Sequence, residues 1–347
     1  MALVSDALLD ELLRVAAAAG CELDRVPDVA ALRGRWKAAP MVFVDERFAG
    51  ECGQADLPRR PGVVVVCGGP PEAGTWAAAV ALGVDRLVEL PAAQEWLAGT
   101  LADLVEGPPD DSGRVLAVLG GRGGAGASVL AAAVGQAVLS GGGQGLLIDC
   151  DPLGGGIDLT LGAEEDPGLR WPELRLTGGR VAASALRSAL PSRSGKHGRL
   201  TVLSCDRDGP GPEPGAIAAV VEAGRRAGET VVCDLPRQFT DATCAALDRA
   251  DLAVLVVPAE VRACASAHRV ARRVVERGLE LRVVVRGPAL SGLRAGEIAE
   301  AVGAPLLATM RPEPGLAAAL DRGSFPEGSR GPLARAARSV LAVLRER

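Results

Sequence analysis

The sequence predicts an α/β protein of two domains, each built around a mostly parallel sheet. Its 347 residues suffice for two domains of ordinary size. Short apolar runs typical of buried strands alternate with helical patterns along the chain. A stretch rich in Pro, Gly and Asp at 107–113 separates two regions of strong apolar pattern. We therefore predict domains at 1–106 and 114–347, joined by a linker at 107–113.

The elements of the first domain follow from hydrophobic periodicity and turn residues. The predicted helices are 6–19, 28–34, 74–82 and 92–105, and the predicted strands are 21–25, 41–45, 62–67 and 86–89. Because strands and helices alternate, the strands are expected to pair in parallel with helices on both faces of the sheet.

The second domain repeats this alternation with longer elements. The predicted strands are 114–119, 145–149, 201–204, 230–234, 252–257, 281–285 and 305–308, and the predicted helices are 126–139, 215–226, 240–248, 261–277, 295–301 and 332–346. Two segments rich in Gly, Pro and Ser, 192–198 and 206–215, are expected to be surface loops.

Composition limits the class of protein. Apolar residues make up 48% of the chain and aromatic residues only 2%, which indicates cores of Ala, Val and Leu. No apolar run approaches the roughly 18 to 20 residues of a membrane span, and the N-terminus carries acids where a signal peptide has lysines. None of the eight cysteines forms a CxxC pair, so they are read as small buried hydrophobes. We expect a cytoplasmic protein.

Charge is distributed unevenly. Residues 1–108 hold 16 acids and 9 bases, whereas the remainder holds 27 acids and 29 bases, so an anionic partner is expected to bind the second domain. The chain has 36 arginines and two lysines. In this background, a lysine replaced by arginine needs no functional explanation.

The most informative stretch is Leu119-Gly-Gly-Arg-Gly-Gly-Ala-Gly-Ala-Ser128, which lies between a predicted strand and a predicted helix. Such a turn binds phosphate because its backbone N–H groups point inward and the helix N-terminus adds partial positive charge. The usual loop also supplies a lysine for the β- and γ-phosphates and a hydroxyl for magnesium. Here Ser128 stands in the hydroxyl position, but Ala127 stands in the lysine position.

With three further motifs, this loop resembles the ParA/MinD superfamily of P-loop ATPases, whose deviant loop reads KGGxGKT. Leu146-Leu-Ile-Asp-Cys-Asp-Pro152, followed by Gly156-Ile-Asp-Leu-Thr-Leu-Gly162, matches switch I of the family. Val231-Val-Cys-Asp-Leu-Pro236 matches the Walker B strand, and Ala250–Pro258 matches the next strand. The motifs occur in family order over about residues 114–345, so a P-loop NTPase-like fold with a mostly parallel sheet is implied.

The resemblance also implies a site for ATP and Mg. Asp149 and Asp151 correspond to switch I, with Asp151 orienting the attacking water, and Ser128 and Asp234 correspond to the magnesium site. The nucleotide-binding positions are Gly121, Arg122, Gly123, Gly124, Ala125, Gly126, Ala127 and Ser128. Each acid also has a structural interpretation: Asp149 and Asp151 as caps of the following turn, and Asp234 as the end of a buried strand.

The chain departs from the family at two positions. Without the lysine, the loop loses a charge-assisted phosphate contact worth on the order of 1.5 to 3 kcal/mol, or about one to two powers of ten in affinity. Hydrolysis suffers more, because that lysine also meets charge developing on the transferring phosphoryl group. Arg122 replaces the signature lysine and could still reach across a dimer, whereas Arg286 replaces the asparagine that holds adenine. We therefore expect weak or vestigial ATP binding and no efficient ATPase.

Residues 1–106 resemble, more faintly, the receiver domain of response regulators, a flavodoxin-like fold. Asp45 would be the phosphoacceptor and Asp6 a remnant acid. Cys67 takes the hydroxyl position and Leu90 the lysine position, so nothing neutralises an aspartyl phosphate. We interpret the domain as a pseudo-receiver in which Asp45 is an ordinary strand-end acid.

A receiver-like domain before a MinD-like domain is the arrangement of the CpaE/TadZ branch. Within it, the missing lysine and Arg286 most resemble the actinobacterial CpaE-like septum-site-determining proteins (Ssd). This implies a homodimeric spatial regulator that localises septum formation or a pilus and secretion assembly, with division, pilus or secretion proteins as partners. Through those partners it could join a membrane-associated complex at the membrane or the pole.

Two alternatives stay open. The first is an active ATPase switch that dimerises with nucleotide. The second is a partition protein that binds DNA non-specifically through Arg262, Arg269, Arg273 and Arg277, which recur on one face of a predicted helix. A solvated outer helix explains these arginines better. Likewise, the amphipathic C-terminal helix is expected to dock on the sheet rather than to target a membrane.

Overall fold

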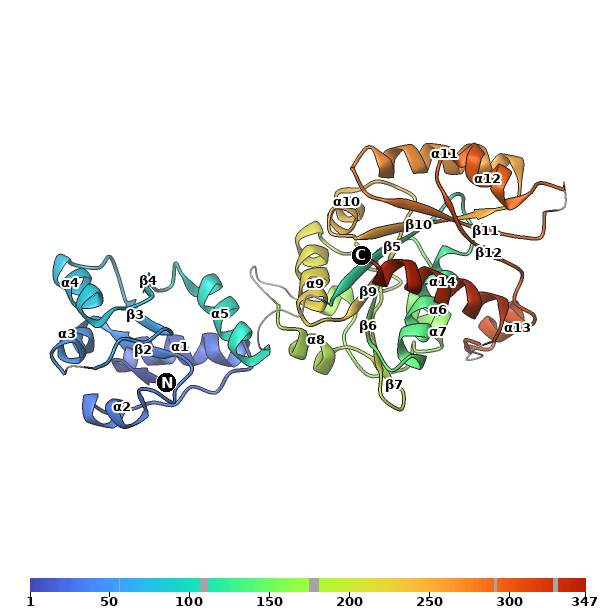
Figure 1. The fold of residues 1–347 in the computed structure, drawn as a ribbon. Helices are drawn as coiled ribbons and strands as arrows, with labels where there is room; N and C mark the ends of the chain where they lie inside the picture. The colour runs from blue at the N-terminus through green and yellow to red at the C-terminus, as the bar shows by residue number, and fades with distance from the viewer. Residues whose placement is uncertain (56, 107–111, 175–180, 290–291, 327–329) are drawn as a thin grey trace. The chain divides into compact units, whose positions relative to one another are not determined.

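The structure is a computed structural model that describes residues 1–347 except 56, 107–111, 175–180, 290–291 and 327–329 (Figure 1). It consists of two compact units. The first comprises Met1–Pro108 with Gly178–Ala185, and the second comprises Pro109–Thr177 with Leu186–Arg347. Most of the predicted linker at 107–113 lies outside the described residues.

The first unit contains a four-stranded parallel sheet in the order β1-β2-β3-β4. Its strands are β1 (Ala2–Leu3), β2 (Val42–Asp45), β3 (Val63–Cys67) and β4 (Arg86–Glu89). Its helices are α1 (Asp6–Ala18), α2 (Val29–Arg35), α3 (Glu46–Gln54), α4 (Ala73–Leu82) and α5 (Gln94–Glu106). One core packs α1 and α5 against the sheet and another packs α2, α3 and α4, so both faces are covered. Strands buried on both faces read as continuous apolar runs, as in the Val-Val-Val-Val-Cys of β3.

In this unit one predicted strand was wrong, and two elements, β1 and α3, were not predicted. The predicted strand at 21–25 is present only as an isolated parallel bridge between Arg25 and Ala2. Helix α3 was not predicted, because its sequence ERFAGECGQ contains two glycines and few apolar residues. The helix begins at this point because Asp45 caps it by accepting a hydrogen bond from the Phe48 backbone N–H.

The second unit contains an eight-stranded sheet in the order β12-β11-β10-β5-β9-β6-β8-β7. The strands are β5 (Arg114–Gly120), β6 (Gln144–Asp149), β7 (Ser192–Ser194), β8 (Arg199–Leu203), β9 (Thr230–Leu235), β10 (Leu252–Pro258), β11 (Leu281–Arg286) and β12 (Leu306–Met310). Every pairing is parallel except that of β7 with β8. The glycine loop follows β5, near the centre of this sheet.

The remaining helices lie between these strands or follow the last of them. They are α6 (Ala127–Ser140), α7 (Ile157–Leu161), the 3-10 helix η1 (Trp171–Glu173), α8 (Ala183–Ala189), α9 (Pro214–Arg226), α10 (Asp241–Leu247), α11 (Val261–Val275), α12 (Ala295–Val302), α13 (Leu316–Leu320) and α14 (Pro332–Arg345). The expectation of a loop at 192–198 was wrong for 192–194, where β7 forms a short antiparallel edge strand, and it is confirmed for 195–198. Helix α11 ends at Val275, two residues before the predicted end.

Helix α14 is docked, as expected. Its apolar side packs with α6 and the sheet in one core, and Figure 1 shows α14 beside α6. The buried residues of α14 are Leu333, Ala336, Ala337, Val340, Leu341 and Leu344. Among the described residues, no helix combines the length and apolar character that a membrane span requires.

We predict that Leu341→Ala lowers the free energy of unfolding by about 2 to 5 kcal/mol, because truncating a buried leucine loses apolar burial and leaves a cavity. Leu341 is 4% exposed. Denaturant unfolding of the full chain measures the change. Ser339→Ala on the exposed side of the same helix is the control and should shift stability by less than about 0.5 kcal/mol. A similar small loss for Leu341→Ala would show that α14 is not part of the core.

Candidate functional site

The glycine loop joins β5 to α6 in a conformation that requires glycine at several positions. Gly124 and Gly126 have φ values of +68° and +95°, in the left-handed region that favours glycine. At Gly121, an added Cβ would lie 2.8 Å from the Cβ of Ala267 on α11. The glycines of the motif therefore preserve both the turn and its close packing.

Helix α6 begins directly after this turn. Gly126 is its N-cap, Ala127 is its first residue, and its first turn carries no acidic side chain. The free N–H groups of a helix N-terminus favour an anion. Since Ala127 ends at its methyl group, the loop itself offers backbone donors and the Ser128 hydroxyl but no ammonium.

Two arginine side chains lie at the loop, one from the loop itself and one from β11, and both already have partners within the chain. The Nη2 atom of Arg122 pairs with Oε1 of Glu260 at 2.9 Å. The Nη1 atom of Arg286, at the end of β11, donates to the carbonyl oxygen of Gly124 at 3.0 Å. An added Cβ at Gly126 would lie 3.3 Å from the same Nη1 atom. Sequence analysis singled out Arg286 only as a departure, because nothing in the sequence shows that its side chain spans from β11 to the loop.

Behind the loop, Asp149 ends β6 and is only 2% exposed. Its Oδ1 accepts the Asp151 N–H at 3.0 Å, and its Oδ2 accepts the Ile157 N–H at 2.9 Å and the Cys205 N–H at 3.3 Å. Burial raises the pKa of this carboxyl, although these backbone hydrogen bonds act against the rise. Asp149 therefore organises the backbone that follows β6, as its interpretation as a cap predicts.

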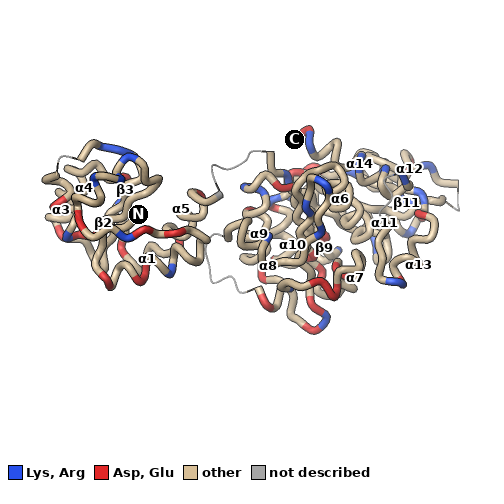
Figure 2. Tube along the Cα trace, turned by 90° about the horizontal axis from the view of Figure 1, so that it is seen from below, with Lys and Arg blue, Asp and Glu red and all other residues tan. Residues whose placement is uncertain are grey.

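Asp234 lies next to Asp149, because the register of β6 and β9 pairs the two residues. Burial raises the pKa of Asp234 to about 8, the charge of Asp149 acts in the same direction, and a hydrogen bond with Ser128 opposes the rise. Ser128 and Asp234, the two residues proposed for magnesium, thus lie together. Figure 2 shows acidic residues gathered beside β9 and α7.

Asp151 lies two residues after Asp149 in the chain and is partly exposed. Its Oδ1 accepts the backbone N–H of Leu153 at 3.1 Å, which closes a local turn. The side chain that family resemblance assigns to the attacking water therefore also has a structural role.

A buried ion cluster, which sequence analysis missed, fixes the segment after Asp151. Asp158 is 1% exposed and pairs with Nε of Arg170 and Nη2 of Arg207, both at 3.1 Å. Burial alone would raise the pKa of Asp158, but hydrogen bonds from Arg207 and Arg170 hold it below its ordinary value. The only sequence signal was the place of Asp158 in the Gly156–Gly162 motif, because neither arginine belongs to a motif.

Arg170 extends the cluster by donating to the backbone carbonyls of Ala163, Glu164, Asp166 and Gly168. The next residue, Trp171, is buried and donates its indole N–H to the carbonyl of Asp149 at 2.7 Å. The segment from Asp149 to Trp171 is therefore held at both ends and in its middle by hydrogen bonds and ion pairs within the chain.

Two of the four arginines that were predicted to share one face of α11 make contacts within the chain. Arg277 lies beyond the end of the helix and pairs with Asp248 at 2.7 Å, and Arg273 stacks over the ring of Phe239 at 4.5 Å. Arg262 and Arg269 are exposed. The prediction that all four share one helix face was therefore wrong for Arg277.

In the first unit, the residues at the receiver positions serve the fold. Asp45 is 4% exposed, and its carboxylate accepts the backbone N–H groups of Ser5 at 2.7 Å and Phe48 at 3.0 Å. Burial raises the pKa of the Cys67 thiol to about 12. Leu90 is buried. This geometry supports the interpretation of Asp45 as a structural cap.

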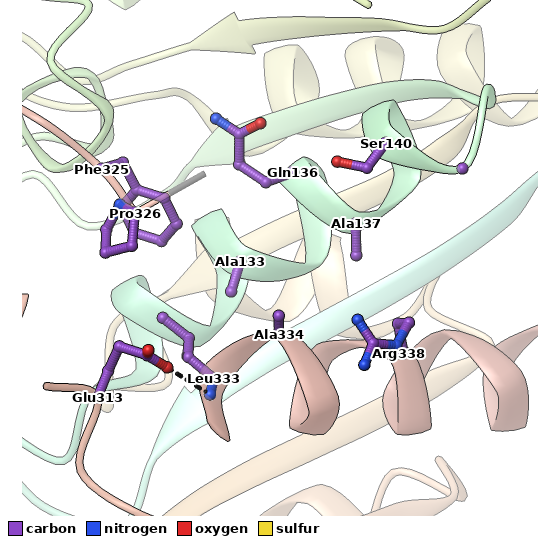
Figure 3. Close-up of a pocket in the computed structure, with 11 residues that line it drawn as sticks. Ala133, Gln136, Ala137, Ser140, Glu313, Phe325, Pro326, Leu333, Ala334 and Arg338 are labelled. Atoms are coloured by element: carbon purple, nitrogen blue, oxygen red, sulfur yellow. Dashed lines mark hydrogen bonds between the residues drawn. The ribbon is translucent and has the colours of Figure 1, made fainter. Parts of the chain in front are cut away.

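One hollow lies away from the glycine loop, toward the C-terminal half of α6. It encloses about 220 Å³ between α6 and α14 (Figure 3). Glu313 at its edge caps α14 by accepting the backbone N–H of Leu333 at 2.9 Å. Its lining combines apolar residues with the polar side chains of Gln136, Ser140, Glu313 and Arg338, and it includes no residue of the glycine loop, so it does not extend the loop site.

Comparison with known proteins identifies the family. The chain is 48% identical over 345 residues to the uncharacterized protein Rv3660c of Mycobacterium tuberculosis, and the match covers 99% of this chain and 96% of that protein. The chain belongs to the Rv3660c family. Residues 2–112 also match the model of the Rv3660c-like, CheY-like N-terminal domain. The first unit of this family member therefore has a CheY-like fold.

Solved structures identify the fold of the second unit as that of the ParA/MinD P-loop NTPases. A ParA family ATPase of Chlorobium tepidum matches with a TM-score of 0.56 and 14% identity over 67% of this chain and 99% of that one. MinD of Pyrococcus horikoshii, complexed with Mg-ADP, matches with a TM-score of 0.52 and 17% identity over 67% and 98%. Aquifex aeolicus MinD, solved in complex with MinC, gives 0.52 and 22% over 66% and 96%. At these identities the likeness shows the fold alone.

We predict that Asp234→Asn stabilises the folded chain at alkaline pH. The wild-type carboxyl keeps its proton up to about pH 8 when folded, whereas its ordinary pKa is 3.8. The folded state therefore loses stability relative to the unfolded state as pH rises from about 4 to about 8. At pH 8.5 the variant should gain at least about 1 kcal/mol, and the gain should shrink toward pH 5.

Urea unfolding of both chains across this pH range measures the difference. Asp208→Asn, on an exposed loop, controls for the loss of one negative charge. A gain for Asp234→Asn that does not depend on pH would contradict the assignment of a raised pKa to this carboxyl.

Proposed function

We propose that the protein is a spatial regulator of the CpaE/TadZ branch, related to septum-site-determining proteins. In this role it marks a site for septum formation or for a pilus and secretion assembly, and its nucleotide binding is weak or vestigial. One observation carries the proposal: the chain has the glycines and the serine of the ParA/MinD phosphate loop, yet Ala127 stands in the position of its lysine.

The remaining residues fit part of a nucleotide. The loop Gly121–Ser128 would hold phosphate oxygens through backbone N–H groups, and Ser128 with Asp234 would hold Mg. The bound nucleotide would supply a phosphate chain that joins the loop to the metal. Burial raises the pKa of Asp234 in the free chain, and a bound cation would favour the ionised carboxylate that ligates it.

The nearby arginines do not restore the missing charge. Arg122 is neutralised by Glu260 at 2.9 Å. Arg286 contacts a carbonyl of the loop, and carbonyls face away from a cradle whose N–H groups point inward. A phosphate chain in the loop therefore gains the backbone and helix N-terminus but lacks a charge-assisted contact worth about 1.5 to 3 kcal/mol.

In this proposal the molecule acts through the surfaces it presents rather than through turnover. We propose a cytoplasmic homodimer that binds division proteins or pilus and secretion proteins and is recruited through them to the membrane or the pole. The CheY-like unit supports this role, because the Asp45 side chain caps α3 and binds the Ser5 N–H, which commits it to the fold rather than to phosphotransfer.

An active ATPase switch is the second candidate. It is favoured by the adjacency of Asp149 and Asp234 and by the hydrogen bond of Ser128 with Asp234, which keep the magnesium side of the site in place. In that case Asp151 would orient the attacking water, and Arg122 would leave Glu260 to reach a second protomer. Non-specific DNA binding has less support, since Arg273 and Arg277 already have partners within the chain.

We predict that Ala127→Lys increases the affinity for Mg-ATP by about one to two powers of ten, because it restores the charge-assisted phosphate contact. Isothermal titration of the full chain measures the affinity. Ala127→Gln, which adds length without charge, is the matched control and should bind as weakly as the wild type.

Equal affinity for wild type and Ala127→Lys would contradict the proposal, because another cation would then already serve the phosphates. Phosphate release by the wild type that Asp151→Ala abolishes would favour the ATPase switch instead. Folded wild type with no turnover would favour the regulator.

A further inference from the structure

A second hollow lies on the surface of the second unit, at the end of helix α6 that is remote from the glycine loop. It encloses about 600 Å³ between the last turn of α6 and the tip of the hairpin that joins β7 to β8. We call it the hairpin groove. The polar side chains that line it belong to Gln136, Ser140, Ser194, Lys196 and His197.

Glycines fix the two turns that form the groove. Gly142, just after α6, has a φ of +79°, and an added Cβ there would lie 3.5 Å from the Cβ of His197. At Gly198, an added Cβ would lie 2.7 Å from the carbonyl oxygen of Leu139. The Gly195 N–H donates to the Gly198 carbonyl at 2.9 Å and closes the hairpin. The hairpin tip is therefore held against the end of α6, which gives the groove a defined shape.

The groove combines positive charge with neutral hydrogen-bond donors. Lys196 is one of two lysines in the chain, and His197 is one of two histidines. Within the part of the chain that the structure describes, neither side chain has an ion pair or a hydrogen bond. The Gln136 amide and the hydroxyls of Ser140 and Ser194 add further donors. None of the described residues that line the groove is acidic.

We propose that the hairpin groove binds a small molecule that carries a phosphate monoester. Such a group has a charge of about −1.5 to −2 at neutral pH and three strong acceptor oxygens. The Lys196 ammonium offers three donors and a full positive charge, and the hydroxyls and the amide can satisfy the remaining oxygens. A carboxylate, with one charge and two oxygens, would use only part of this donor set.

The C-terminal end of α6 opposes an anion only weakly. A helix C-terminus usually disfavours negative charge, because its last carbonyl groups lack partners. Here the carbonyls of Ala137 and Val138 accept the backbone N–H groups of Gly141 and Gly143, both at 3.0 Å. These hydrogen bonds reduce the partial negative charge at the helix end, and Lys196 outweighs what is left.

The size of the groove favours a small molecule over nucleic acid. Sites for small molecules enclose roughly 300 to 1,000 Å³, and the volume of the groove falls in this range. A phosphate fills only part of it, and Leu139 offers apolar surface to the rest of the ligand. A nucleic-acid strand needs cations along several successive phosphates, whereas the basic side chains that line the groove are those of two neighbouring residues.

The groove is separate from the nucleotide site. Helix α6 has 14 residues, so at about 1.5 Å per residue its two ends lie about 20 Å apart. Binding in the groove therefore does not depend on the glycine loop or on the proposed function, and the two can be tested separately.

Proton–carbon NMR of the full chain, labelled at histidine and without nucleotide, tests the proposal. Glucose 6-phosphate is the probe, and glucose is the uncharged control, both at constant ionic strength. The His197 signal should shift and saturate with a dissociation constant of about 0.1 to 10 mM, as expected of a small, open site. The His268 signal is the internal reference, because its ring is bonded to the Val302 carbonyl at 3.1 Å, and it should not move. Glucose should shift neither signal.

Variants of the groove have matched controls. Lys196→Gln should weaken binding about fivefold or more, because it removes the charge-assisted contact. Lys37→Gln, at the exposed lysine of the first unit, should leave binding unchanged. Ser140→Glu, which places a like charge in the groove, should abolish binding, whereas Ser339→Glu on the exposed side of α14 should not. An unchanged His268 signal shows that each variant remains folded.

Three results overturn the proposal. The first is a His197 signal that does not respond to glucose 6-phosphate up to about 50 mM, well above the expected dissociation constant. The second is a shift of both histidines without saturation, because the phosphate then binds at no defined site. The third is equal binding by wild type and Lys196→Gln, because the ammonium then makes no contact with the phosphate.

Discussion

The pairing of Asp149 with Asp234 beside a phosphate loop without lysine is the constraint on which the rest of the site depends. Two buried carboxyls on neighbouring strands repel each other when both are ionised, and burial penalises each charge. In a complete loop, a lysine would offset this repulsion and would favour the ionised forms. In this loop Ala127 takes that position, and burial together with the charge of Asp149 raises the pKa of Asp234.

The region that follows the first carboxyl is held by contacts within its own chain. In a nucleotide switch, a segment is ordered by the phosphate and its magnesium and is released on hydrolysis. Here the segment from Asp149 to Trp171 is held by Asp158, by two arginines and by the backbone hydrogen bonds of Asp149. The proposed role as a scaffold requires that these contacts order the segment with or without nucleotide.

Much of this could be predicted from the sequence, because the signals are local. Apolar strands such as Leu252–Pro258, the glycine loop and the strand-end acids identified the sheet and the site. The contact of Arg286 with Gly124 and the pairing of Arg170 with Asp158 could not be predicted, because they join distant parts of the chain through flexible side chains. Strand β7 and helix α3 were missed because tertiary packing, rather than local propensity, stabilises them.

The most direct test of this account is hydrogen–deuterium exchange of the full chain with and without millimolar Mg-ATP. Amides at 150–173 report the ordering of the segment after Asp149, and amides at 121–130 report occupancy of the loop. The account predicts that 150–173 are equally protected in both conditions, whether or not the loop responds. Protection of 150–173 that appears only with Mg-ATP would contradict it, because the nucleotide would then be ordering a working switch.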